Sequence, residues 1–221
     1  MRAEAPVEIT KRFLQRDIFN SHPNVKRCPA ILDELQNLYG ILPYYDYRLE
    51  VGKANAFFSK DYDQGFFDQH VEIQGIPTAS LIKWQDNHIF FAPYEKSLVM
   101  SQGPSYLEGV NNNITLMGGR FDIGKYFRNM NFVFYFNKLG GNSLVVDSEI
   151  PLYYLRFHTE RPIVFKQFYV SFELSKFYKH IIESTTSPLR KGKRLSDFYD
   201  MWSKFGFKKK IIKMIEKDGF N

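Results

Sequence analysis

The stretch 131–170 constrains the fold of this chain more than any other part of the sequence. Four short runs of Val, Ile, Leu, Phe and Tyr follow one another there, and each is bounded by Gly, Pro, Asn or Asp. Runs of this composition and spacing are typical of adjacent antiparallel strands. The pattern therefore predicts strands at 131–136, 144–147, 152–157 and 163–170.

Several of these runs are apolar at consecutive positions instead of alternating between apolar and polar residues. Such strands are covered on both faces, as in a sandwich or a closed barrel. The composition agrees, because 17% of the residues are aromatic and a single cysteine excludes a disulfide scaffold. We predict a mainly β protein with a β-sandwich, β-clip or jelly-roll-like core, an N-terminal helix and C-terminal helices.

Outside this stretch, the segment 44–51 alternates between apolar and polar residues and predicts a half-buried strand. Turn-forming residues separate the remaining candidates. These further predicted strands are 70–75, 79–84, 88–91, 97–101 and 113–117.

A helix is predicted from Pro29, because proline suits the first helical turn. Gly40 stands where a glycine commonly ends a helix. The apolar residues between them follow the helical period. They are Ile31, Leu32, Leu35, Leu38 and Tyr39.

A second amphipathic helix is predicted at 172–184, with Ser171 as its N-cap. Its core-facing residues would be Leu174, Phe177, Tyr178 and Ile181. The tail beyond it predicts one or two helices interrupted near Gly206.

We divide the chain into an N-terminal arm (1–28), a β-rich core domain (29–187) and a basic helical tail (188–221). The arm is polar and fits either a short docked helix or a flexible segment. The tail contains ten Lys and Arg against four acidic residues, so it holds the whole net charge of +6.

The charge of the tail has two interpretations. Its cations could make weak, non-specific contacts with nucleic acid or another anionic partner. Alternatively, Trp202, Phe205 and Phe207 dock on the protein's own body and leave the lysines in solvent. The residues assigned to anionic contacts are Arg190, Lys191, Lys193, Arg194, Lys208, Lys209 and Lys210.

Four segments carry a resemblance: VKRCPAILDELQNLYGILPYYDYRLEV, GRFDIGKYFRNMNFVFYF, SLVVDSEIPLYYLRFHTERP and FYDMWSKFGFKKK. Their order resembles a conserved family of tailed bacteriophages, especially T4-like phages of marine cyanobacteria, which has no agreed function. The resemblance implies a viral protein that acts in the host cytoplasm or the virion.

GRFDIGKY and the strands after it are also similar to the last strands of dUTPase-like β-clip proteins. In that fold a loop holds the nucleoside, and the resemblance places only Asp122 and Tyr126 on it. The Gly-rich tail of that fold is absent from this sequence. The implied alternative function is nucleotide binding.

His70 and Glu72 are two residues apart on a predicted strand, so both would face the same side. With His158 from a facing strand they would form the two-histidine, one-carboxylate set that binds Fe(II). Arg161 would then hold the carboxylate of 2-oxoglutarate. This hypothesis describes an Fe(II)/2-oxoglutarate-type oxygenase on a double-stranded β-helix.

The sequence contains no Gly-x-Ser-x-Gly, no phosphate-binding glycine loop and no Cys/His zinc spacing. This favours a non-enzymatic structural protein that binds protein partners or assembles with itself, without a cofactor. No run reaches the ~20 apolar residues of a membrane span. The first residues also lack the apolar stretch of a secretory signal peptide, so we expect neither feature.

Overall fold

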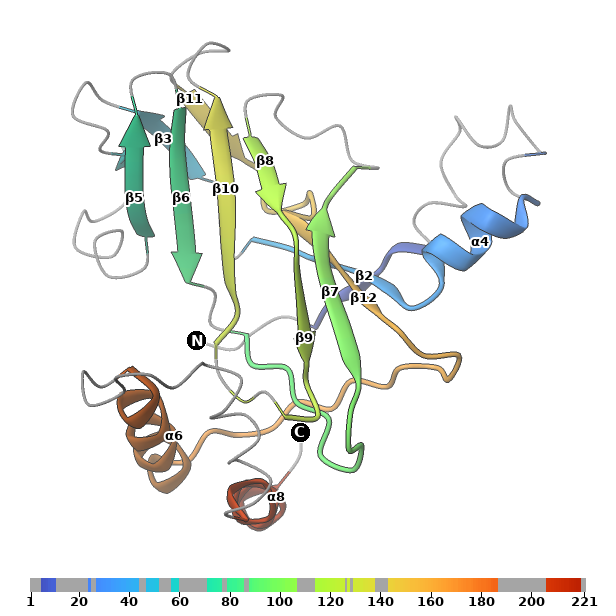
Figure 1. The fold of residues 1–221 in the computed structure, drawn as a ribbon, viewed down its shortest axis with the longest axis vertical. Helices are drawn as coiled ribbons and strands as arrows, with labels where there is room; N and C mark the ends of the chain where they lie inside the picture. Colours follow the sequence, from blue (N-terminus) through green and yellow to red (C-terminus); the bar gives the residue numbers. More distant parts are fainter. Residues whose placement is uncertain are drawn as a thin grey trace, which may run out of the picture. The chain divides into compact units, whose positions relative to one another are not determined.

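The computed structural model describes residues 5–10, 24, 27–43, 47–51, 57–59, 71–76, 79–85, 88–106, 114–125, 127, 129–137, 143–186 and 206–219. Within these residues the chain is mainly β, as predicted (Figure 1). The described strands are β1 (Val7–Glu8), β2 (Leu38–Ile41), β3 (Tyr47–Val51), β4 (Phe57–Ser59), β5 (Val71–Ile76), β6 (Ala79–Gln85), β7 (Val99–Pro104), β8 (Ile114–Met117), β9 (Gly119–Asp122), β10 (Asn131–Asn137), β11 (Ser143–Val146) and β12 (Tyr153–Phe157). The described helices are α4 (Pro29–Leu35), α6 (Phe172–Thr186) and α8 (Phe207–Asp218), which confirms an N-terminal helix and C-terminal helices.

The chain divides into two compact units, each made of segments that are separate in sequence. The first contains Met1–His88, Met100–Arg120 and Asn129–Pro162. The second contains Ile89–Val99, Phe121–Arg128 and Ile163–Asn221. The predicted boundaries after residues 28 and 187 stay a prediction, because residue 187 and most of the arm lie outside the described residues.

The strands form three sheets with the orders β1-β2-β12-β7-β9, β5-β6-β10-β8 and β11-β3-β4. β12 pairs antiparallel with β2 and β7, and β10 pairs antiparallel with β6 and β8. The four strands of the second sheet lie side by side in Figure 1. Three of the four strands predicted in the central stretch, at 131–136, 144–147 and 152–157, are thereby confirmed.

The five-stranded and four-stranded sheets contact each other through aromatic side chains in the first unit. The ring centroid of Phe132 on β10 lies 5.0 Å from that of Tyr153 on β12. Within the four-stranded sheet, Phe132 also stacks on Trp84 of β6, with 5.8 Å between the ring centroids. The chain passes from one sheet to the other at Gly118, between β8 and β9. A Cβ there would lie 2.8 Å from the carbonyl oxygen of Gln102, so glycine permits the close crossing. This packing agrees with the predicted sandwich-type core.

The prediction that the first helix continues to Tyr39 is wrong. α4 ends at Leu35, and Leu38–Ile41 instead forms β2. Asn37 interrupts the helix with a left-handed backbone (φ 52°). Its Nδ2 donates hydrogen bonds to the carbonyl oxygens of Thr159 at 2.7 Å and Arg161 at 3.0 Å. The helix therefore stops because of partners more than a hundred residues away.

Gly40 is not the helix C-cap that the sequence predicts. It lies within β2, opposite Tyr154 of β12. A Cβ on Gly40 would lie 2.8 Å from side-chain atoms of both Ile9 and Pro151. This glycine serves close packing instead of ending a helix.

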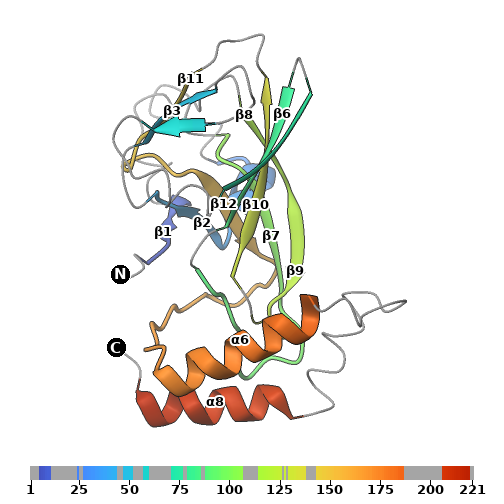
Figure 2. The ribbon, with the colours of Figure 1, turned by 90° about the vertical axis from the view of Figure 1, so that its left-hand side faces the viewer.

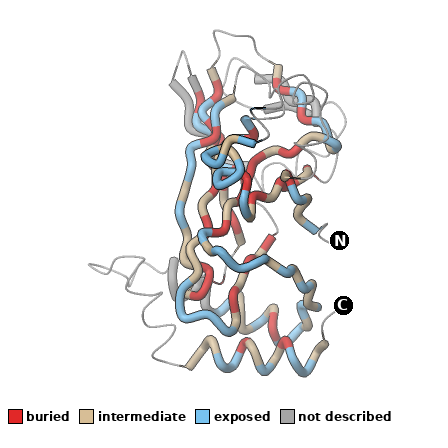
Figure 3. The backbone as a smooth tube through the Cα atoms, turned by 90° about the vertical axis from the view of Figure 1, so that its right-hand side faces the viewer, coloured by how far each residue is buried: buried red, intermediate tan, exposed pale blue. Residues whose placement is uncertain are grey.

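The second unit contains α6 and α8, which lie side by side (Figure 2). The Ser171 hydroxyl accepts a hydrogen bond from the Leu174 N–H at 3.2 Å, which confirms the predicted N-cap. Leu174 and Ile211 are fully buried, and buried positions recur along α8 in Figure 3. Phe177 and Tyr178 are half-buried beside them. α8 begins after Gly206, which agrees with a helix boundary there; the part of the predicted tail helices before Gly206 lies outside the described residues.

Two predicted strands are wrong. The segment 88–91 forms no ladder, and 163–170 forms a single bridge, at Phe168. In the second unit Phe165 packs edge-on against Phe90, and Phe168 lies 6.3 Å from Phe127. These contacts anchor 163–170, which forms no ladder with any strand that the structure describes.

Candidate functional site

The end of β12 brings together polar side chains from several elements of the five-stranded sheet. Arg156 of β12 lies opposite Ser101 of β7 in the antiparallel register. His158 follows two residues later, and its Nε2 lies 2.9 Å from the Ser101 hydroxyl, within hydrogen-bonding distance. We call Ser101, His158 and the neighbouring Arg120 the β12 end cluster.

Arg156 connects this part of the sheet to α4. Its guanidinium donates to the Glu34 carboxylate, to the Asp33 carboxylate at 3.2 Å and to the Asp33 carbonyl at 2.8 Å. Two carboxylates thus pair with the single positive charge of Arg156, which leaves this group of three with a net charge of −1. The bonds connect α4 to β12, and Glu34 is close enough to His158 to affect its pKa.

His158 stays neutral to a lower pH than a free histidine. Partial burial lowers its pKa below the ordinary value, the positive charges of Arg120 and Arg156 lower it further, and Glu34 opposes them. Arg120 makes no hydrogen bond or ion pair with another described residue. No described residue bonds the Nδ1 of His158, so the carboxylate that orients a catalytic Ser–His pair is not found among them. The cluster thus combines a hydroxyl, an imidazole and one guanidinium.

The predicted metal ligands are distributed over different elements. Glu72 lies on β5 of the four-stranded sheet, opposite Lys83 in register, whereas His158 directly follows β12 of the five-stranded sheet. His70 lies outside the described residues. Among the described residues no group of three His, Cys, Asp or Glu side chains could hold a metal ion. The metal hypothesis stays a prediction that the described residues do not test.

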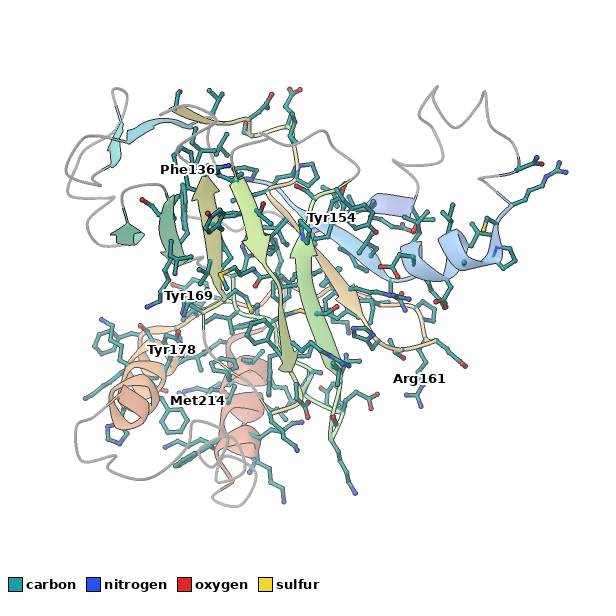
Figure 4. The ribbon with its side chains drawn as sticks, turned by 45° about the horizontal axis from the view of Figure 1, so that its top comes forward. Phe136, Tyr154, Arg161, Tyr169, Tyr178 and Met214 are labelled. Atoms are coloured by element: carbon teal, nitrogen blue, oxygen red, sulfur yellow. The ribbon has the colours of Figure 1, made fainter. Side chains whose placement is uncertain are left out.

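Arg161, which that hypothesis assigns to a cosubstrate, extends outward from the loop after β12 (Figure 4). Its backbone carbonyl accepts the hydrogen bond from Asn37 described above. The backbone carbonyl of Arg161 therefore takes part in the contact at which α4 ends.

Asp122, the residue assigned to nucleotide binding by resemblance, organises a loop of the second unit. Its carboxylate accepts hydrogen bonds from the Ser97 hydroxyl at 2.7 Å and from the Leu98 and Gly124 N–H groups at 3.1 Å. Lys125 adds an ion pair at 3.7 Å. These internal bonds give Asp122 a structural role, and Tyr126 lies outside the described residues.

Only some of the cations predicted to contact an anionic partner lie within the residues that the structure describes. Arg190, Lys191, Lys193 and Arg194 lie outside the described residues. Lys208 donates to the carbonyl oxygens of Glu95 and Gly124, at 2.5 and 3.0 Å. Burial lowers the pKa of Lys208, and the carboxylates of Asp122 and Glu95 oppose that effect. This lysine is engaged within its own unit.

Lys210 places its ammonium 4.4 Å above the ring of Phe177, while Lys209 is exposed. Phe207 packs edge-on against Phe177, with 5.9 Å between ring centroids. The described end of the tail is thus folded onto α6, which agrees with the docking interpretation for Phe207. Trp202 and Phe205 lie outside the described residues, and binding of an anionic partner by the tail stays a prediction.

The segment 163–172 exposes large apolar side chains. The exposed fractions are 78% for Val164, 62% for Tyr169 and 83% for Phe172. Tyr169 is labelled in Figure 4, on the stretch that leads into α6. With Phe165 and Phe168 turned toward the unit's own aromatic residues, this segment presents an anchored apolar surface to solvent.

Sequence reasoning missed Ser101, Arg120 and the exposure of 163–172. Ser101 and His158 are 57 residues apart and meet only through the register of β7 on β12. No local spacing indicates that meeting. The apolar run at 163–170 is visible in the sequence, but it predicted a paired strand and not an exposed segment.

We compared the chain with models of protein families, with curated proteins and with solved structures, and none of them matched. Among the described helices, none is long and apolar enough to cross a membrane.

Proposed function

We propose that this chain is a non-enzymatic binding or assembly protein, and that the segment 163–172 pairs with the same segment of a second copy. The observation that carries the proposal is the exposure of Val164 and Tyr169 on one anchored, extended stretch and of Phe172 where α6 begins. Soluble monomers rarely expose large continuous apolar patches, and such patches commonly mark interaction sites.

The backbone of the segment supports strand pairing with another chain. Apart from the bridge at Phe168, residues 163–170 belong to no ladder. An extended segment of this kind is a template for an added strand. Two identical segments can pair antiparallel about a two-fold axis, because each then meets the same surface on its partner. A second copy is therefore the occupant we propose.

The resemblance to phage proteins supports a setting for this assembly. A virion or a virion precursor in the host cytoplasm brings many copies of one chain to high local concentration, which favours weak symmetric contacts. We accordingly propose a virion-associated role.

Sedimentation velocity over a wide range of protein concentration tests the proposal. The wild-type chain should self-associate, and the triple variant V164S/Y169S/F172S should remain monomeric. M117S is the matched control, because it removes an exposed apolar side chain from β8 in the other unit and should leave association unchanged. A wild-type chain that is monomeric at the highest concentration would contradict self-association. A loss of association in M117S as large as that in the triple variant would contradict the assignment of the interface to 163–172.

A further inference from the structure

We propose that the β12 end cluster, formed by Ser101, Arg120 and His158, binds a tetrahedral oxyanion such as sulfate or phosphate. This proposal is independent of the assembly function and concerns a different surface. Ser101 lies on β7, Arg120 lies on β9, and His158 is the residue after β12. β12, β7 and β9 are successive neighbours in the five-stranded sheet, so the three residues come from adjacent strands.

The first support is geometric. The Ser101 hydroxyl and His158 Nε2 are 2.9 Å apart and share a hydrogen bond; when the protonated imidazole donates its Nε2–H to the Ser101 oxygen, the Ser101 hydroxyl hydrogen is left to donate to an oxyanion. Ser101 is half-buried and His158 is exposed, which leaves the pair accessible from solvent. The hydroxyl is a donor suited to anionic oxygen, and the protonated imidazole beside it adds positive charge.

The second support is the distribution of charge. Arg156 already pairs with Asp33 and Glu34, but Arg120 has no carboxylate partner among the described residues. Arg120 is near enough to His158 to affect its protonation. A guanidinium without a partner is a strong binding group for sulfate or phosphate. The ligand would supply the anionic hydrogen-bond acceptor for the Arg120 guanidinium, which has none among the described residues.

The cluster also predicts how binding depends on pH. The charged groups that face His158 are Arg120 from β9, Arg156 from β12 and Glu34 from α4. A bound dianion adds negative charge beside the imidazole and raises its pKa. By linkage, the affinity must then increase as the pH falls through the range in which His158 gains its proton. Sulfate keeps its charge over this range, so its pH dependence reports on the protein.

The experiment is a titration of the full-length protein with sodium sulfate, followed through the histidine ring signals in NMR spectra at constant ionic strength set with sodium chloride. The variant H158Q identifies the signal of His158. We expect saturable shifts of that signal, tighter binding at about pH 5.5 than at about pH 8, and roughly tenfold weaker binding in R120Q, because a charge-assisted hydrogen bond is lost. S101A should weaken binding by a smaller factor.

K83Q is the control, because Lys83 is an exposed cation on β6 of the four-stranded sheet. It should bind sulfate as the wild type does. Titration with phosphate at the higher pH then shows whether the cluster accepts both oxyanions. The proposal is overturned if the His158 signal does not shift saturably, or if K83Q weakens binding as much as R120Q does. Circular dichroism of each variant confirms that it is folded.

Discussion

The runs 131–137 and 163–170 are built from similar residues but adopt different structures. The first becomes β10, which is paired on both sides and buries Phe132, Phe134 and Phe136 almost completely. The second stays extended, forms one bridge and exposes Val164 and Tyr169. Each lies in a different unit of the chain.

The difference shows what a run of β-branched and aromatic residues specifies. It favours extended backbone in both places, because these side chains fit an extended chain. Whether a ladder forms depends on neighbouring strands. β10 has β6 and β8 beside it, each paired over several residues, whereas aromatic anchors at Phe165 and Phe168 hold the second run. Three substitutions test this contrast.

The largest effect should come from β10. We expect Phe134→Ala to lower the free energy of unfolding by about 3–5 kcal/mol, because the ring is buried and its removal leaves a cavity. Its centroid lies 5.0 Å from that of Phe132, so a neighbouring contact is lost as well. Urea unfolding of the two proteins measures the change. A loss below ~1 kcal/mol would mean that β10 is not the packed centre of its sheet.

An intermediate effect should come from the anchors of 163–170. Phe168 is half-buried and packs against the cluster around Phe127 and Leu174. We expect Phe168→Ala to cost about 1–3 kcal/mol, since part of the ring is already in solvent. The same unfolding experiment applies, with limited proteolysis of the segment as a second readout. A cost equal to that of Phe134→Ala would remove the distinction between the two runs.

The smallest effect should come from the exposed side of the same segment. We expect Tyr169→Ser to change the free energy of unfolding by less than about 0.5 kcal/mol in dilute protein, as is usual for surface substitutions. The measurement must be made at concentrations where the wild type is monomeric. A large destabilisation there would show that Tyr169 supports its own fold and is not available to a partner.

The sequence alone determined the elements whose signals are local. The strands at 131–137, 143–146 and 153–157 follow from composition and bounding turns, and α6 follows from its apolar period and the Ser171 cap. Gly206 precedes α8 in the left-handed conformation that glycine adopts easily. For the candidate site, the sequence singled out His158 but none of the groups beside it.

Only the tertiary structure decided the rest, and the physical reason is the same in each case. Leu38 and Tyr39 continue the helical pattern, yet they form part of β2 because β12 lies beside them and Asn37 bonds to Thr159 and Arg161. Residues 163–170 have the composition of a strand but no ladder partner among the described residues. Ser101 meets His158 only because β7 pairs with β12 in one register. Hydrogen-bond partners that are distant in sequence decided these outcomes, and local propensities of about a few tenths of a kcal/mol per residue are too weak to override them.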